Sequence, residues 1–183
     1  MTMAIKCDLT RFGTLVVTPN QSMINHKTIQ RKYGVNTNAN TREKNFHGNT
    51  HNTGAKDLND DIWKELSAAY RWHIDLQMRL AKNLQDAKEG ANSILDNSIV
   101  YLASEGGWGP MTFSSGNGSF NGPHSCDNMT QFYITGMNNL KQGEHIRPTT
   151  PKHACEALLT AMRAVGYKGN FGDVSKVVAE MEA

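Results

Sequence analysis

The chain has 183 residues, of which 38% are hydrophobic and 20% are charged, and its formal net charge is +2. A domain of this length buries a sizeable core without disulfides or structural zinc, and the near-neutral charge gives no support for binding to nucleic acid or to an anionic membrane surface. The three cysteines form no Cys-x-x-Cys pair, which excludes a zinc ribbon and a thioredoxin-like redox motif.

The first twenty residues lack the basic start and the unbroken apolar run of a signal peptide. No part of the chain approaches the ~20 consecutive apolar residues of a membrane span. The sequence therefore predicts neither a signal peptide in this chain nor a membrane span. Within the same stretch, residues 14–18 are rich in β-branched side chains and are followed by Pro19, which predicts a strand.

Residues 19–56 carry almost no apolar periodicity and are rich in Asn, Thr, Lys, Gly and His, so they are predicted to form a long loop. A loop of this length inside a compact domain is usually functional or mobile. His47 and His51 are four residues apart, but the glycine, asparagine and threonine between them argue against a helix. Two interpretations stay open for the pair: metal ligands, or polar residues of a solvated loop.

An amphipathic helix is predicted over residues 57–89, because apolar side chains recur there at spacings of three and four. Asp60 and Asp61 favour the positive end of the helix dipole, and Gly90 is expected to end the helix. His73 lies on the apolar face, where a hydrogen-bonded core or interface histidine is the expected role. The recurring positions are Ile62, Leu66, Ala69, His73, Leu76, Leu80, Leu84 and Ala87.

Two further strands are predicted, over residues 98–103 and 130–135. The first has four large apolar residues in a row, which is typical of a strand buried on both faces of a parallel sheet. Together with the long helix, the strands predict a single α/β domain over residues 1–183, with a mainly parallel sheet flanked by helices.

The C-terminal part of the chain is predicted to be helical. Thr150 is expected to be the N-cap, with Pro151 at the first helical position, and Gly166 is expected to stop this helix. A short terminal helix is predicted over residues 173–181.

A glycine-rich loop over residues 104–129 follows the central strand and carries the residues with the clearest chemical potential. Glu105 would emerge at the carboxyl end of that strand, where ligands bind in open α/β sheets. It is interpreted either as a metal ligand or as a loop carboxylate that caps backbone N–H groups. His124 is either a metal ligand whose imidazole Asp127 orients, or a surface residue of the loop.

Several common catalytic motifs are absent from the sequence: the P-loop, the dinucleotide-binding glycine motif, the Gly-x-Ser-x-Gly nucleophile turn and His-Glu-x-x-His. No serine or threonine has an evident base partner in the sequence. No catalytic residue is therefore predicted from motifs alone.

Several short motifs follow one another along the chain: CDLTR at 7–11, the histidine-rich loop, the long helix, LDNSIV at 95–100, SEG at 104–106, and His124 before DNM at 127–129. Their order resembles the C-terminal half of the bacterial domain-of-unknown-function family 1552, which is similar to the alkaline phosphatase and sulfatase superfamily. The resemblance covers nearly the whole chain and implies a partial alkaline-phosphatase-like α/β fold.

The resemblance also implies a set of metal ligands. Ser104 and Glu105 would take the place of a metal-binding Asp-His pair, His124 that of a later histidine ligand, and His47 or His51 that of a further ligand. The implied cofactor is a divalent ion such as zinc, calcium or magnesium. The histidine that follows in the superfamily is replaced here by Gly106, which removes one expected ligand.

Three functions follow from these observations. The first is that the chain is a metal-assisted hydrolase of phosphate or sulfate esters, or half of one. The resemblance implies relatives of about twice this length that are usually exported and carry the nucleophile in an N-terminal half, and the lack of that half here weakens the expectation of catalysis by this chain alone. Alternatively, it is a non-catalytic binding or assembly module that uses its two long loops and the apolar face of its long helix to form a homodimer or to bind a partner. A third hypothesis is that a separately encoded polypeptide supplies the N-terminal half. Bound metal would discriminate between catalysis and assembly.

Overall fold

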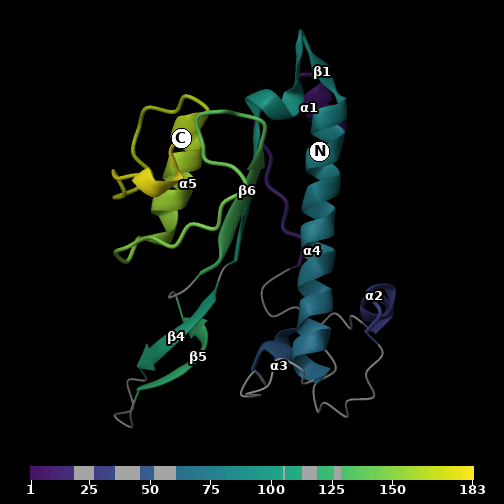
Figure 1. Ribbon diagram of the computed structural model, residues 1–183, viewed down its shortest axis with the longest axis vertical. Coiled ribbons are helices and arrows are strands. Elements are labelled where there is room, and N and C mark those ends of the chain that lie inside the picture. The colour runs from purple at the N-terminus through teal and green to yellow at the C-terminus, as the bar shows by residue number, and fades with distance from the viewer. Residues whose placement is uncertain (19–26, 36–45, 52–60, 105, 113–118, 126–128) are drawn as a thin grey trace. The chain divides into compact units, whose positions relative to one another are not determined.

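The computed structural model describes residues 1–18, 27–35, 46–51, 61–104, 106–112, 119–125 and 129–183 (Figure 1). The chain divides into two compact units where the sequence predicts one domain. Unit 1 comprises Met1–Phe12, Met78–Ser104 and Met129–Ala183, and unit 2 comprises Gly13–Gln77 and Glu105–Asn128.

The described residues contain helices, 3-10 turns and short antiparallel strand pairs, joined by irregular segments. The helices are α1 (Thr2–Lys6), α2 (Lys27–Lys32), α3 (Phe46–His51), α4 (Asp61–Asp86) and α5 (Ala154–Ala164), with 3-10 turns η1 (Ile94–Asn97) and η2 (Ala179–Met181). The strands are β1 (Lys88–Glu89), β2 (Asn92–Ser93), β3 (Ile99–Ala103), β4 (Gly107–Thr112), β5 (Ser119–Ser125) and β6 (Gln131–Thr135).

The strands form three antiparallel pairs, β1 with β2, β3 with β6, and β4 with β5. The strands predicted over 98–103 and 130–135 are confirmed as β3 and β6. Within the part of the chain that the structure describes there is no parallel pair, and in β3 only Val100 is fully buried. The mainly parallel, alkaline-phosphatase-like sheet therefore stays a prediction.

The long amphipathic helix is confirmed as α4, and Asp61 lies in its first turn. Its apolar face is buried at Leu66, Ala69 and Leu84, which are at most 3% exposed, and is half-buried at Ile62, Leu76 and Leu80. The helix ends at Asp86 rather than at Gly90. Gly90 has φ +62° and lies in the tight turn between β1 and β2, where a left-handed backbone favours glycine.

The core of unit 1 is built from the end of α4, η1 and the sheet β3–β6. The turn η1 begins with a capping box in which Ser93 and Asp96 exchange side-chain and backbone hydrogen bonds. The buried cluster is Ala81, Leu84, Ala87, Ile94, Leu95 and Val100, with Ile5, Leu80 and Ile134 packed against it.

The helix α5 contacts β3 and completes unit 1. Its N-cap is His153, whose Nδ1 accepts a hydrogen bond from the Cys155 N–H at 3.2 Å, and not Thr150 as predicted. Gly166 does stop the helix: it has φ +95°, and its N–H and that of Tyr167 donate to the last turn at 2.9 and 3.1 Å. The predicted terminal helix over 173–181 is reduced to the turn η2.

Unit 2 contains α2, α3, the first part of α4 and the hairpin β4–β5. The two segments predicted as long loops thus contain regular structure, two short helices in 19–56 and a hairpin in 104–129. The strand predicted over 14–18 is not found, since these described residues belong to no strand pair. Leu15 and Val16 are 63% and 76% exposed.

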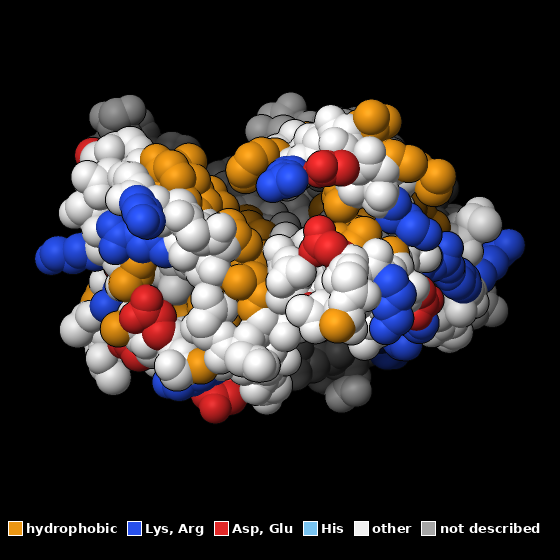
Figure 2. All heavy atoms as spheres, turned by 90° about the horizontal axis from the view of Figure 1, so that it is seen from above, with side chains coloured by type: hydrophobic (Ala, Val, Ile, Leu, Met, Phe, Trp, Pro, Cys, Tyr) orange, Lys and Arg blue, Asp and Glu red, His pale blue; other side chains and the backbone are white. Residues whose placement is uncertain are grey.

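None of the helices in the described ranges is long and apolar enough to cross a membrane. The face seen in Figure 2 mixes hydrophobic side chains with Lys, Arg, Asp and Glu side chains.

Candidate metal centre

The histidines His47 and His51 both lie in a helix, α3, and not in a loop. The prediction that the segment between them is not helical is therefore wrong. A single glycine lowers helix stability by only about 1 kcal/mol, which tertiary packing can offset. Within the helix, the Thr50 hydroxyl donates a hydrogen bond to the His47 carbonyl oxygen at 2.6 Å. Residues four apart in a helix share a face, so positions 47 and 51 lie one turn above the other.

The side chain of Phe46 joins α3 to α4. Its ring lies 5.5 Å from the ring of Tyr70 and 5.5 Å from that of His73, both in edge-to-face orientation. Such pairs are favourable because the positive ring edge faces the negative ring face. The contact fixes the start of α3 directly before His47.

The backbone of His124 lies in an irregular part of the hairpin β4–β5. Gly107 pairs with Ser125 and Gly109 pairs with Gly122, so one residue of β4 faces two residues of β5, Pro123 and His124. This is the arrangement of a β-bulge, a feature that redirects a side chain and is frequent beside functional sites. Pro123 has no N–H to donate to the ladder, which accounts for the irregularity.

The strand β5 and the helix α3 are in contact within unit 2. The fold therefore brings together the backbone elements that bear His47, His51 and His124, residues that the resemblance implies for one set of metal ligands. Gly107, two residues after position 105 in the sequence, pairs with Ser125, the residue that follows His124.

The other predicted site residues are Glu105, Asp127 and Ser104. Glu105 and Asp127 lie outside the described residues. Ser104 directly follows β3 and is exposed. Among the side chains that the structure describes, no group of three His, Cys, Asp or Glu residues is arranged to hold a metal ion.

The position of His73 agrees with its predicted role as a hydrogen-bonded core histidine. It is half-buried, its Nε2 lies 3.5 Å from the Thr18 hydroxyl oxygen, and its ring also contacts that of Trp72 at 5.0 Å. No local pattern predicts that His73 contacts the helix of His47, because the contact depends on Phe46.

A second attachment in unit 2 was also not predicted. The Tyr33 hydroxyl donates to Asp75 Oδ2 at 2.5 Å, and the Arg71 guanidinium lies 5.0 Å from the Tyr33 ring centre. These contacts join the segment after α2 to α4, so both short helices of unit 2 are anchored on one long helix.

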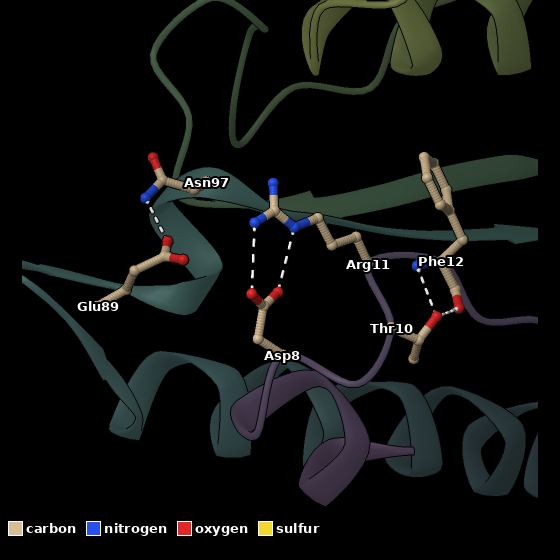
Figure 3. A network of polar contacts seen from close by, with 6 residues as sticks. All are labelled: Asp8, Thr10, Arg11, Phe12, Glu89 and Asn97. Atoms are coloured by element: carbon tan, nitrogen blue, oxygen red, sulfur yellow. Dashed lines mark hydrogen bonds and ion pairs between the residues drawn. The ribbon is translucent and has the colours of Figure 1, made fainter.

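The CDLTR motif of the sequence forms a polar surface cluster in unit 1 (Figure 3). Arg11 Nε and Nη2 donate to the Asp8 carboxylate at 3.1 and 3.4 Å, which lowers the Asp8 pKa from its ordinary value. Nearby, the Asn97 amide donates to Glu89 at 2.7 Å. The ion pair is exposed to water, and exposed pairs contribute little to stability.

Comparison with protein-family models, with curated proteins and with solved structures gave no match to this chain.

Proposed function

We propose that unit 2 binds a divalent metal ion through His47, His51, His124 and Glu105, and that this ion serves the hydrolysis of phosphate or sulfate esters. The observation that carries the proposal is the contact between α3 and β5. It supports the proposal because two of the four groups share one helical face and a third lies at a bulge on the contacting strand.

The chemistry of the donor set selects among the three implied ions. Imidazole nitrogen is a good ligand for zinc, whereas calcium and magnesium prefer sets made of oxygen atoms. Three histidines and one carboxylate therefore fit zinc best.

The residues of the chain would divide the remaining work. If bound, the ion would supply polarisation of the ester oxygen and a lowered pKa of a water, which would have to join the four protein ligands as a fifth. Asp127, three residues after His124, would accept a hydrogen bond from the imidazole and so fix which ring nitrogen faces the ion. Phosphate and sulfate esters are anionic, and a divalent ion held by three imidazoles and one carboxylate would keep a net positive charge that attracts them.

Zinc binding by the purified chain tests the proposal. After a chelator wash, calorimetric titration is expected to show one zinc ion bound per chain. Loss of a group that only orients a ligand weakens metal binding about 10–100-fold, so His47→Ala, His51→Ala, His124→Ala and Glu105→Ala should weaken it at least as much. His145→Ala, an exposed histidine of unit 1, is the matched control and should bind zinc as the wild type does.

Ester hydrolysis is the second measurement. The zinc-loaded chain is expected to hydrolyse an aryl phosphate or aryl sulfate, to lose that activity in a chelator and to regain it on addition of zinc. Absence of stoichiometric zinc, or a zinc affinity equal to that of the wild type in all four variants, would contradict the metal site. Zinc binding without hydrolysis would contradict only the catalytic part of the proposal.

A second candidate function, an assembly module, is favoured by one observation. Large apolar side chains are exposed between residues 9 and 16, and apolar surface of this kind often marks a protein interface. On α4, Tyr70, Ile74 and Met78 are also exposed, at 48%, 39% and 50%. In the segment 9–16, the exposed fractions are 79% for Leu9, 85% for Phe12, 63% for Leu15 and 76% for Val16.

In this second candidate function, the partner is another copy of the chain. Sedimentation is then expected to show a homodimer that Phe12→Ser and Leu15→Ser convert to a monomer. A monomeric wild type would remove this candidate.

A further inference from the structure

The helix α3 cannot be stable on its own. It has six residues, one of them Gly48, and isolated helices shorter than about 12 residues are marginal in water because the first turn costs more entropy than its hydrogen bonds offset. The position of His47 and His51 therefore depends on contacts that α3 makes with the rest of unit 2.

Phe46 provides a contact of this kind. Its half-buried ring meets Tyr70 at an interplanar angle of 75° and His73 at 70°, with 5.5 Å between centres in each case. Tyr70 and His73 are three residues apart on α4, so they form one surface for the ring.

The surface that receives Phe46 is itself fixed. His73 contacts the Trp72 ring and lies 3.5 Å from the Thr18 hydroxyl oxygen. Tyr70 and His73 belong to a helix of 26 residues that is buried at Leu66, Ala69 and Leu84. The ring of Phe46 thus links a short helix to a long and well-packed one.

We infer that Phe46 is the positioning residue of the metal centre, and that metal binding and helix formation in α3 are coupled. This inference rests on the proposed metal site and adds how that site is held and regulated. Phe46 is not itself a ligand of the ion in this account, and acts by placing the helical face of positions 47 and 51.

The coupling follows from thermodynamic linkage. An ion bound to both histidines joins two residues one turn apart, which is possible when that turn is helical, so the ion stabilises the helix. By reciprocity, anything that destabilises the helix weakens binding of the ion by the same factor. A variant that removes the Phe46 contact should therefore lower zinc affinity without removing a ligand.

Hydrogen exchange and zinc titration together test the inference. In the wild type, zinc is expected to slow amide exchange in peptides spanning Phe46–His51 at least about tenfold. Phe46→Leu should weaken zinc binding up to about tenfold, the factor that corresponds to an aromatic pair. Phe46→Tyr keeps the ring and should restore binding.

Two further variants make the result specific. Tyr70→Leu removes the other side of the contact and should weaken zinc binding as Phe46→Leu does, so the test does not depend on the folding of one variant. Phe171→Leu changes a partly exposed phenylalanine of unit 1 and should leave zinc affinity unchanged.

The outcomes separate this inference from the proposed function. Wild-type zinc affinity in both Phe46→Leu and Tyr70→Leu, or unchanged exchange in α3 on zinc binding, would overturn the role of Phe46 and leave the metal site standing. Failure of the wild type to bind zinc would overturn the metal site, and the inference with it.

Discussion

Tyr101 of β3 gives the chain a specific sensitivity to alkaline pH. Burial raises the pKa of its phenol to about 12, and the nearby Cys155 adds to the shift, while the hydroxyl donates a hydrogen bond to Gln131 of β6. The unfolded phenol has a pKa of about 10, so the unfolded chain ionises first. The stabilisation by the neutral phenol is therefore complete below about pH 10 and is lost as the pH rises towards 12.

Urea unfolding from neutral to alkaline pH measures this effect. The free energy of unfolding of the wild type is expected to fall above about pH 10, and Tyr101→Phe should reduce that fall because it removes the titrating group. An identical pH dependence in the variant would show that Tyr101 does not ionise differently in the two states.

At the scale of elements, a buried hydroxyl of α5 helps to hold the C-terminal segment, together with Arg163 Nη2, which donates to the Ser175 carbonyl at 3.0 Å. Thr160 is 1% exposed, and its Oγ1 accepts a hydrogen bond from the Val178 N–H at 2.9 Å and donates one to the Glu156 carbonyl at 2.7 Å. Thr160→Val keeps the shape and leaves the Val178 N–H buried without this acceptor, which should lower the free energy of unfolding by about 1–3 kcal/mol.

Chemical denaturation and hydrogen exchange check this expectation. The exchange of residues 176–183 should become faster in Thr160→Val, while β3 and β6 keep their protection. A variant as stable as the wild type would mean that water or another group satisfies the Val178 N–H.

The elements that the sequence predicts well are those whose signals are local. The period of α4 and the apolar run of β3 are visible in the residues themselves, and Gly166 ends α5 through its own left-handed backbone. In contrast, the direction of the β3–β6 pairing depends on chain topology. An apolar run is equally compatible with a parallel and an antiparallel neighbour, as β3 illustrates.

The candidate site was predictable as a set of residues and not as an arrangement. Residue type alone suggests His47, His51 and His124 as ligands. Their common location depends on the contact between α3 and β5, and α3 depends in turn on Phe46, which meets Tyr70 and His73 far along the chain. Contacts of this kind override local helix propensity and leave no periodic pattern in the sequence.

For the whole molecule, the division into two units separates the candidate chemistry from the larger buried cluster. The described elements that bear the three histidines belong to unit 2, whereas the cluster around Leu84 and Val100 belongs to unit 1. Zinc should therefore protect the described parts of unit 2 from hydrogen exchange more strongly than β3, β6 and α5. A site in unit 2 is the claim on which the functional account depends.

X-ray absorption spectroscopy of the zinc-loaded chain tests that claim most directly, because it counts imidazole ligands around the ion. The account expects three imidazoles with zinc–nitrogen distances of about 2.0–2.1 Å, and the loss of one of them in His124→Ala. A spectrum with oxygen ligands alone, or one that His124→Ala leaves unchanged, would contradict it.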